Sequence, residues 1–559
     1  MGRQRGRLGP GRPRLFLGVG ERSRSEGWDR PMPLWILNGT VVDGTGAPPR
    51  RAHLLIDGDT IMDVGDALQP PAESDAEVID AEGLTVAPGF IDLHSHSDVA
   101  LLVDPVVPCK LNQGITLELL GQDGLSVAPL TDEVAPLWRR HLSGLVGTYD
   151  VEWDWRSFDD YLTRLGPTAA NVAALVGHGT LRLNVMGMAN RPATAREIDQ
   201  MCDLLRASLA AGAFGLSGGL VYTPGAYASF DELVALNRIV AEAGRIWVVH
   251  IRYEGDRIDD ALDEMFRIVD LTGVALHISH FKLMGRNNWG RAQAVVDRIE
   301  EQRARGRDVT VDQYPYMAGS TMLSAILPPW AHAEGPERLR EYLRDPIRLE
   351  KMAAEVEAGS PHWESFVGNA GWENIYISDV AAEEHRDLVG KSLSQIGDLW
   401  RCSPFEAAVR LLLEADLAVS MVLHAMHEDD VRTILAQPWR LGGTDALLGG
   451  KPHPRSYGSY PRILGRYVRD EGVVSLPEAI RQMTGGAAQR LRIDDRGVIA
   501  PGMKADLCLF DADRIIDRAT FDDPMQLPDG IAWVIVNGQP VLRDQQPTGN
   551  LPGRVLRQR

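Results

Sequence analysis

Two histidines at the end of an apolar run are the first residues in this sequence that could bind a metal ion. The segment from Val86 to Asp98 reads VAPGFIDLHSHSD, so one residue separates His94 from His96. Side chains two positions apart on an extended strand point to the same face, which lets both imidazoles reach one ion. The pair predicts a metal site. Separate structural roles for the two histidines are the alternative that this pattern leaves open.

Further histidine and aspartate side chains follow later apolar segments in the same way. They are Asp123, His178, His250, His280 and Asp445. Each one alone has an ordinary explanation, such as a turn for the aspartate in Gln-Asp-Gly. Together, imidazoles and carboxylates at corresponding strand ends indicate zinc or another divalent first-row ion.

Eight apolar segments that read as strands of a parallel sheet would position these side chains. The segments are GFIDLHSH, GITLELLGQDG, NVAALVGHG, AFGLSGGL, RIWVVHIRYE, VALHISHFK, DVTVDQYPY and RLGGTDA. Residues 195–211, 230–243 and 257–272 have the apolar spacing of helices between strands. This alternation predicts an α/β fold, a (β/α)8 barrel of the TIM type, in which the carboxyl ends of the strands form the active face.

Two β-rich segments flank the barrel region. Residues 33–90 and 491–545 contain short strands separated by Asn-Gly and Asp-Gly turn signals, and we expect them to pair into one small β-sandwich domain. The barrel then spans 91–490. Its interval at about 318–439 is too long for a simple connection, which predicts an inserted lid or subdomain. Residues 546–559 are predicted to be a tail.

The first 32 residues are rich in Arg, Gly and Pro and offer little apolar surface for packing. They are predicted to be a disordered basic extension or an over-long start assignment. A basic arm that touches nucleic acid or lipid is the alternative. The apolar piece LFLGVG is short and lacks a small-residue cleavage site, so a secretory signal is not predicted.

Composition narrows the class of protein further. The 559 residues carry a formal net charge of -19, which argues against a nucleic-acid partner because phosphate binding needs a basic surface. The four cysteines are scattered, which fits a reducing, cytoplasmic compartment. No segment has the roughly 18 uninterrupted apolar residues of a spanning helix, so no membrane partner is predicted. The oligomeric state is left open.

Several motifs together resemble the metal-dependent amidohydrolase superfamily, and within it the N-acyl-D-amino-acid deacylases, or D-aminoacylases. In order they are PGFIDLHSHSD, LVGHGTLR, GLSGGLVYTPGAYAS, HIRYEGD, HISHFK, DQYPYMAGST, LGGTDA, HPRSYGSYPRIL and APGMKADLCLFD. The resemblance extends from Pro33 to about Arg543. It implies a barrel with a small β-sandwich, and hydrolysis of N-acyl-D-amino acids to a carboxylate and a D-amino acid.

The resemblance also implies roles for single residues. Those implied to bind metal are His94, His96, His250 and His280. Asp445 matches the catalytic aspartate, which would take a proton from the attacking water and pass it to the leaving nitrogen. Residues that resemble or suit substrate contacts are Lys282, Tyr314 and Arg455, with His178 as a weaker candidate for polarising the carbonyl. Lys282 and Arg455 would hold the α-carboxylate, with second-shell or surface ion pairs as the alternative.

Two positions depart from the family pattern. D-aminoacylases usually carry a metal-binding cysteine in GNCG after the second strand, whereas this chain reads GQDG and places Asp123 there. A carboxylate can bridge two ions but is a harder ligand than a thiolate. Zinc is therefore the first expectation, with manganese or cobalt as alternatives and one or two ions bound. Phe281 stands where relatives often have another histidine.

Aromatic residues are predicted to shape the site. Tyr222 and Tyr227 follow the fourth strand and could line an acyl or side-chain pocket, with simple loop packing as the alternative. Trp330, Trp363 and Trp372 lie in the inserted interval, where they could belong to a lid that excludes water or to a small core of the insertion.

Other functions fit parts of the sequence. Within the superfamily they are a cyclic-amide hydrolase of the dihydroorotase or hydantoinase kind and a dipeptidase that acts on a D-residue. The fourth segment, AFGLSGGL, contains no lysine, which disfavours the carbamylated lysine of hydantoinases. A metal-free scaffold protein is disfavoured because the histidines and Asp445 are all present. The sequence does not define the substrate side chain or the strictness of D-selectivity.

Overall fold

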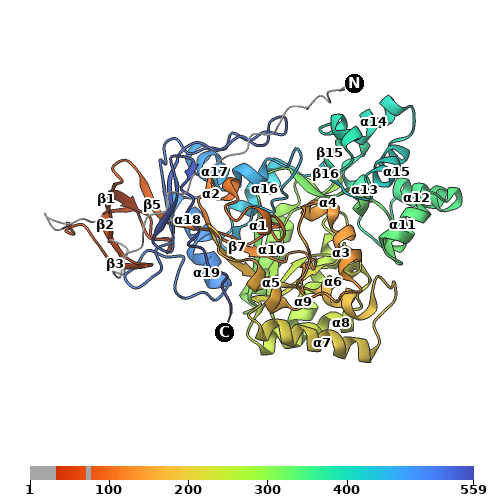
Figure 1. Cartoon of the computed structure of the whole chain (residues 1–559), viewed down its shortest axis with the longest axis horizontal. Helices are drawn as coiled ribbons and strands as arrows, with labels where there is room; N and C mark the ends of the chain where they lie inside the picture. The colour runs from red at the N-terminus through yellow and green to blue at the C-terminus, as the bar shows by residue number, and fades with distance from the viewer. Residues whose placement is uncertain (1–32, 71–76, 559) are drawn as a thin grey trace, which may run out of the picture.

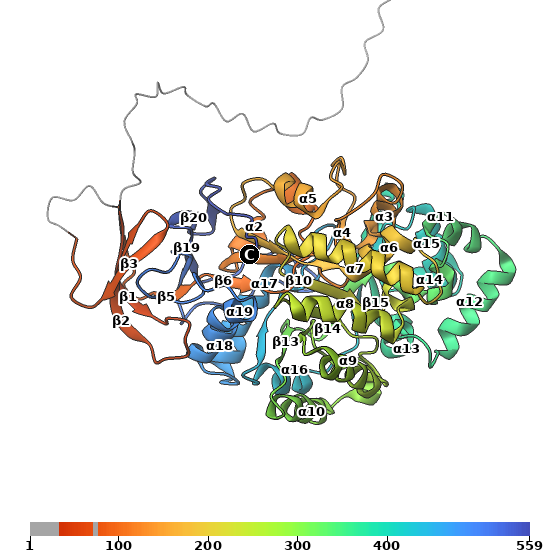
Figure 2. The same cartoon turned by 90° about the horizontal axis from the view of Figure 1, so that it is seen from below.

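The terminal β-sheet and the helical insertion lie at opposite ends of the molecule, with the parallel strands between them. The computed structural model describes residues 33–70 and 77–558. Figures 1 and 2 show β1 to β3 at one end and helices α11 and α12 at the other. The predicted basic extension 1–32 lies outside the described residues.

Each of the eight apolar segments contains a strand. The strands are β6 (Phe90–Asp92), β7 (Ile115–Leu120), β8 (Asn171–Ala174) with β9 (Val176–Gly177), β10 (Gly215–Gly219), β11 (Ile246–His250), β12 (Ala275–Ile278), β13 (Val309–Gln313) and β17 (Arg440–Gly442). Parallel pairing runs β6-β7-β8 and β9-β10-β11-β12-β13-β17. A parallel bridge between Ser95 and Ala446 joins the residues that follow β6 and β17. Most of these strands are buried along their whole length, which explains their unbroken apolar sequences.

Helices follow the strands, and α7, α8 and α9 correspond to the three ranges that the apolar spacing predicted. They are α6 (His178–Met186), α7 (Ala195–Ala210), α8 (Phe230–Glu242), α9 (Ile258–Thr272), α10 (Ala292–Ala304) and α16 (Glu428–Leu435). In α9 the buried side chains recur every three or four residues, as in Leu262, Met265 and Val269, and form one apolar face. A capping box between Thr194 and Glu197 fixes the start of α7.

Shorter helices complete this region. They are α1 (Ala100–Val103), α2 (Pro108–Leu111), α3 (Ala135–His141), α4 (Ser143–Val146), α5 (Phe158–Arg164), α17 (Arg455–Arg462), α18 (Leu476–Met483) and α19 (Gly485–Arg490). A π-helical segment, Ile463–Asp470, continues α17.

Both ends of the chain contribute to one nine-stranded sheet. Its strands are β1 (Leu34–Val41), β2 (Arg50–Asp57), β3 (Thr60–Gly65), β4 (Glu77–Asp80), β5 (Thr85–Pro88), β18 (Leu507–Phe510), β19 (Ile531–Val536), β20 (Gln539–Arg543) and β21 (Gln546–Pro547). The antiparallel pair of β5 and β18 joins the two halves. Within the predicted tail, Val555 pairs with Val172 of β8.

The segment between β13 and β17 forms its own layer of strands and helices. A three-stranded antiparallel sheet contains β14 (Ala318–Met322), β16 (Val419–His424) and β15 (Ile375–Val380). Its helices are α11 (Pro336–Tyr342), α12 (Pro346–Ala358), α13 (Phe366–Ala370), α14 (Leu393–Trp400) and α15 (Pro404–Glu414). Their apolar faces form a cluster of buried residues that includes Leu323, Ile377 and Leu411.

Across residues 33–70 and 77–558, no helix combines the length and the apolar character that a membrane crossing requires.

A buried ion pair ties the terminal sheet to the parallel strands. Asp506, directly before β18, accepts hydrogen bonds from the Arg496 side chain, from the backbone N–H of Asn537 (2.7 Å) and from Nδ2 of Asn171 (3.0 Å). Asn171 is the first residue of β8. The side chains of Arg496 and Asp506 are 3% and 4% exposed.

We expect Asp506→Ala to lower the free energy of unfolding by about 2–4 kcal/mol, because it removes the buried acidic partner of Arg496 and leaves that guanidinium with Asp495, which is 53% exposed. Urea unfolding followed by tryptophan fluorescence measures this. The control is Asp203→Ala, whose partner Arg206 and own side chain are 58% and 78% exposed, and which should cost less than about 1 kcal/mol. Equal midpoints for the two variants would contradict the role given to the pair.

Candidate metal centre

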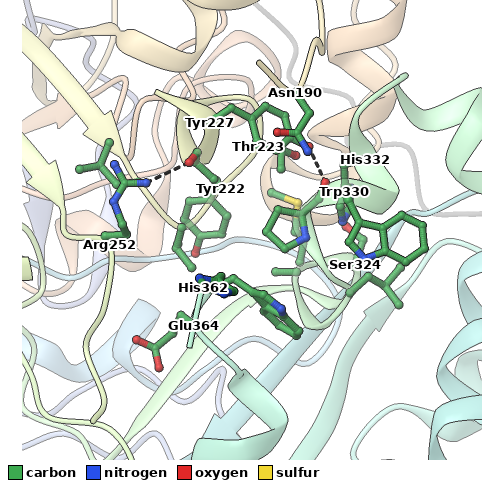
Figure 3. Close-up of a pocket in the computed structure, with 18 of the residues that line it drawn as sticks. Asn190, Tyr222, Thr223, Tyr227, Arg252, Ser324, Trp330, His332, His362 and Glu364 are labelled. Atoms are coloured by element: carbon green, nitrogen blue, oxygen red, sulfur yellow. Dashed lines mark hydrogen bonds between the residues drawn. The ribbon is translucent and has the colours of Figure 1, made fainter. Parts of the chain in front are cut away.

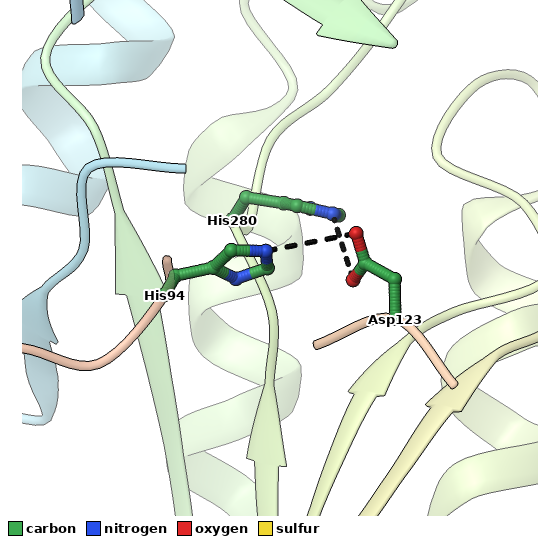
Figure 4. A group of neighbouring side chains, drawn as sticks. All are labelled: His94, Asp123 and His280. Atoms are coloured by element: carbon green, nitrogen blue, oxygen red, sulfur yellow. Dashed lines mark ion pairs between the residues drawn. The ribbon is translucent and has the colours of Figure 1, made fainter. Parts of the chain in front are cut away.

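Side chains from the ends of five parallel strands meet in one buried cluster. They are His94 and His96 after β6, Asp123 after β7, His250 at the end of β11, His280 after β12 and Asp445 after β17. All six are 5% exposed or less. Figure 4 shows His94 and His280 directed at the carboxylate of Asp123. The structure thus brings together every residue for which the sequence predicted metal binding, together with the predicted catalytic aspartate.

Asp123 lies at the centre of this cluster. Its Oδ2 is 3.6 Å from Nε2 of His94 and 3.4 Å from Nε2 of His96. Its Oδ1 is 3.6 Å from Nε2 of His280 and 4.0 Å from Nδ1 of His250. Two ligands about 2.1 Å from one tetrahedral ion are about 3.4 Å apart, so these separations are those of ligands around shared ions.

Asp445 closes the other side of the cluster. Its Oδ1 is 3.3 Å from Nε2 of His96 and 3.7 Å from Nε2 of His94. Ligand atoms within 4.8 Å of one another form three groups among the described residues: His94, His96 and Asp445; His94, Asp123 and His280; and His250, Glu254 and His280. Because neighbouring groups share His94 or His280, the donor set could hold one ion or two.

The unpaired polar atoms of the cluster fit a cation. Nε2 of His94, Nδ1 of His250 and Oδ1 of Asp123 are buried without a hydrogen-bond partner among the described residues. Buried polar atoms without partners are costly, and here they converge on one another. A divalent ion would satisfy them, and imidazole with carboxylate is a suitable donor set for it.

The pKa shifts of the clustered side chains also indicate a site that attracts a cation. Burial alone would lower the pKa of His94, but the carboxylates of Asp123, Asp312 and Asp445 raise it well above its ordinary value. Burial would raise the pKa of Asp123, yet the imidazoles of His94 and His280 hold it well below its usual range. Ionised carboxylates therefore surround the imidazoles, which is an environment that attracts a cation.

Three residues of the cluster adopt left-handed backbone conformations. The φ angles are 54° at Asp123, 34° at His280 and 51° at Asp445. Such a conformation costs a residue with a side chain on the order of 1 kcal/mol and is retained where the surrounding structure enforces it. Each of the three residues closely follows a strand, where the chain must turn so that the side chain faces the cluster.

The sequence analysis did not single out Asp312 or Glu254, which lie directly behind the histidines. Oδ1 of Asp312 is 3.5 Å from Nδ1 of His94 and accepts the backbone N–H of His280 at 2.8 Å. Oε1 of Glu254 is 3.1 Å from Nδ1 of His280. A carboxylate behind a ligating histidine fixes the tautomer and directs the other nitrogen at the metal. The signal that could have found them is their place inside the DQYPY and HIRYEGD motifs.

The two predicted carboxylate-binding cations border the cluster, and both already have acidic partners. Nζ of Lys282 is 2.6 Å from Oε1 of Glu254, and a guanidinium nitrogen of Arg455 is 2.9 Å from Oδ2 of Asp445. Arg455 also stacks on the ring of Tyr314, with its guanidinium carbon 4.5 Å from the ring centroid. The Tyr314 hydroxyl is buried without a hydrogen-bond partner among the described residues.

Tyr222 and His178 contact different parts of the structure. The ring of Tyr222 meets that of His250 edge-on at 5.1 Å, and its hydroxyl is 2.8 Å from Oγ1 of Thr321 in β14. His178 is fully buried, with Nε2 2.8 Å from Oε1 of Glu232 on α8. Tyr222 therefore connects the strand ends to the insertion, and His178 connects them to the surrounding helices.

Comparisons with known proteins define the class. A model of the amidohydrolase family matches residues 77–343 and 379–542. The D-aminoacylase of Alcaligenes xylosoxydans xylosoxydans is 37% identical to this chain, covering 95% of this chain and 99% of its own length. The N-acyl-D-glutamate deacylase of the same organism is 36% identical, covering 94% and 96%. The chain belongs to the amidohydrolase family.

A solved structure agrees with this assignment. The N-acyl-D-glutamate deacylase of Bordetella bronchiseptica, complexed with zinc and a phosphonate inhibitor, superimposes with a TM-score of 0.78 at 35% identity, covering 94% of this chain and 99% of that one. The mixed α/β fold of the chain matches that structure, and the family resemblance carried by the sequence motifs is confirmed.

We expect Asp312→Asn to weaken metal binding by about 10- to 100-fold, because an amide holds the tautomer of His94 less firmly than a carboxylate does. Competition between the metal-depleted protein and a chelator of known affinity measures this without any activity assay. The control is Asp203→Asn on the exposed surface of α7, which should bind metal as the unmodified protein does. Identical affinities for the two variants would rule out a role for Asp312 behind His94.

Proposed function

We propose that this protein is a metal-dependent hydrolase that cleaves the amide bond of N-acyl-D-amino acids to a carboxylate and a D-amino acid. The observation that carries the proposal is the buried convergence of four histidines and two aspartates at the strand ends. It occurs in a chain that is 37% identical to a D-aminoacylase over nearly its full length.

The architecture that serves this function is a (β/α)8 barrel with a terminal β-sandwich and an inserted lid. The parallel pairings and the Ser95–Ala446 bridge support closure of the eight strands into a ring. The pairing of β5 with β18 supports a single small domain built from both chain ends. Because strands of such a ring share one direction, their carboxyl ends form a single face.

The metal is held by residues of the cluster already described. His94 and His96 would hold an ion beside Oδ2 of Asp123, and His250 and His280 would hold one beside its Oδ1. Asp445 borders the first of these positions and stays free to act as the acid and base. A divalent ion bound there would polarise the amide carbonyl and would make water nucleophilic at neutral pH. Zinc is the first choice, supported by the zinc complex of the relative from Bordetella bronchiseptica. Manganese and cobalt are the alternatives, because a carboxylate at position 123 is a harder ligand than a thiolate.

Asp445 is the group that moves the proton. Burial alone would raise its pKa, but Arg455 and the neighbouring imidazoles hold that pKa below its usual range. Asp445 is therefore ionised at neutral pH and able to accept a proton at Oδ1 from the attacking water. It then delivers that proton to the leaving nitrogen, so that the amine departs neutral.

Lys282, Arg455 and Tyr314 are positioned for the α-carboxylate of the substrate. The hydroxyl of Tyr314 has no hydrogen-bond partner among the described residues, and both cations lie over its ring, with Nζ of Lys282 6.0 Å and the guanidinium carbon of Arg455 4.5 Å from the centroid. Glu254 and Asp445 hold the two cations in place before the substrate arrives. Contacts with two cations orient the substrate so that its amide faces Asp445.

The function is tested by assaying the protein after reconstitution with zinc, manganese or cobalt. We expect amine release from N-acetyl-D-amino acids and little from the L-enantiomers, measured by chiral chromatography of the free amino acid. Hydantoin, dihydroorotate and dipeptides ending in a D-residue are included as competing substrates. Faster turnover of any of these than of every N-acetyl-D-amino acid would contradict the proposal.

Asp445→Asn should lower kcat by about 10²- to 10⁴-fold, because the amide cannot accept the proton from water. Elemental analysis of the variant is expected to find metal content near that of the unmodified protein, since the histidines and Asp123 stay in place. Asp203→Asn is again the control. Full activity in Asp445→Asn would exclude this residue as the acid and base.

A further inference from the structure

A cavity of about 310 Å³ lies beside the metal cluster, between the loop after β10 and the insertion. Tyr222 forms the wall nearest the cluster, since its ring contacts the ring of His250. Figure 3 shows Tyr222, Tyr227, Trp330 and Glu364 around this space. Glu364 provides a second link to the cluster, because it accepts the backbone N–H of Glu254 at 2.6 Å.

The walls of the cavity are largely apolar and aromatic. They include Leu220, Tyr222, Met322, Leu327, Trp330 and Trp363. Both predicted aromatic contributions, from the loop after the fourth strand and from the insertion, thus meet in one place. A cavity of this size with such a lining is typical of a site that binds part of a small molecule.

Arg252 is the arginine at this cavity, and all three of its guanidinium nitrogens already donate hydrogen bonds, whereas Nε of Arg455 at the cluster has no hydrogen-bond partner among the described residues. Arg252 forms two contacts of 3.1 Å with the carboxylate of Glu264, and it donates to the carbonyl of Ala226 at 2.9 Å. Its guanidinium is therefore already neutralised by an ion pair with fitting geometry. A carboxylate entering the cavity would have to compete with Glu264.

The buried histidines at the cavity are uncharged at neutral pH. Burial lowers the pKa of His141 to about 4 and that of His332 to about 3. His141 donates from Nε2 to the carbonyl of Thr223, which also fixes its tautomer. The third histidine, His362, is exposed at the rim, where solvent weakens its interactions.

The acidic residue at this cavity would repel a second carboxylate. Glu364 is 7% exposed and accepts two backbone N–H groups and the Asn369 amide. Burying an acidic group of the substrate next to it, without an available cation among the described lining residues, is unfavourable. An apolar group has no charge to desolvate when it enters the cavity, and its burial removes apolar surface from water.

We propose that this cavity receives a large apolar substituent of the substrate, so that the preferred substrates are N-acyl-D-amino acids with an apolar side chain or acyl group rather than N-acyl-D-glutamate or N-acyl-D-aspartate. The inference rests on the proposed function and names the substrate class of the same site. It separates this chain from the relative that is a deacylase of N-acyl-D-glutamate.

Two series of substrates test the inference with the metal-reconstituted protein. The first is N-acetyl-D-alanine, -leucine, -phenylalanine, -glutamate and -aspartate, for which we expect kcat/KM of the leucine or phenylalanine compound to exceed that of glutamate at least tenfold. The second is D-alanine carrying acetyl, butyryl or phenylacetyl groups. The series in which kcat/KM rises with apolar size identifies the part of the substrate that enters the cavity.

A substitution that fills the cavity tests whether the substrate preference depends on this cavity. Ala325 lines the cavity and is partly buried, and Ala325→Trp should lower kcat/KM for the best large apolar substrate at least tenfold, and much less for N-acetyl-D-alanine. Ala325→Leu, a smaller change, should give the same trend to a lesser degree. The control is Ala304→Trp at the exposed end of α10, which should match the unmodified protein. Circular dichroism and metal content verify that each variant is folded.

The outcomes distinguish failure of the cavity assignment from failure of the proposed function. Preference for glutamate or aspartate over leucine and phenylalanine, with D-selective hydrolysis intact, overturns the cavity assignment alone. An equal loss for large and small substrates in folded Ala325→Trp overturns it as well. Absence of turnover with every N-acetyl-D-amino acid contradicts the proposed function and the inference with it.

Discussion

A single buried ammonium group holds together the two strand ends on which the candidate metal centre depends. Nζ of Lys110 lies within hydrogen-bond distance of three side chains, Asp92 (2.6 Å), Ser95 (2.9 Å) and Thr444 (2.9 Å). These residues flank His94 on one strand end and precede Asp445 on the other. Because each partner in a buried ionic cluster is costly to leave unpaired, the spacing between His94 and Asp445 is tightly constrained.

Other buried charges in the centre are also paired with opposite charges. Asp312 and Glu254 lie behind the histidines, and Lys282 and Arg455 are each paired with an acid. Charges that are already paired need no rearrangement when a substrate binds, which is the condition for electrostatic preorganisation. At the cavity beside Tyr222, the arginine at the edge, Arg252, is paired with Glu264, which does not line the cavity. The groups proposed for the chemistry and the walls proposed for apolar recognition therefore lie in adjacent but separate spaces.

Much of the fold could be predicted because its signals are local. Buried parallel strands such as β11 and β12 are continuous apolar runs, and helix α9 repeats its apolar residues with helical spacing. Polar residues that end such strands, such as His250 and Asp445, stand out against the apolar background. Asp312 could not be recognised in this way, since it lies within its strand, and its place in the DQYPY motif was the available signal.

The sequence by itself determined the order of the eight parallel strands, the residues at their ends and the family to which the chain belongs, because periodicity and motifs reside in short stretches of chain. Only the tertiary structure decided which side chains meet. It paired Lys282 with Glu254 and Arg455 with Asp445, and it placed Tyr222 against the insertion. Contacts between segments far apart in the chain depend on packing and burial, which no local pattern records.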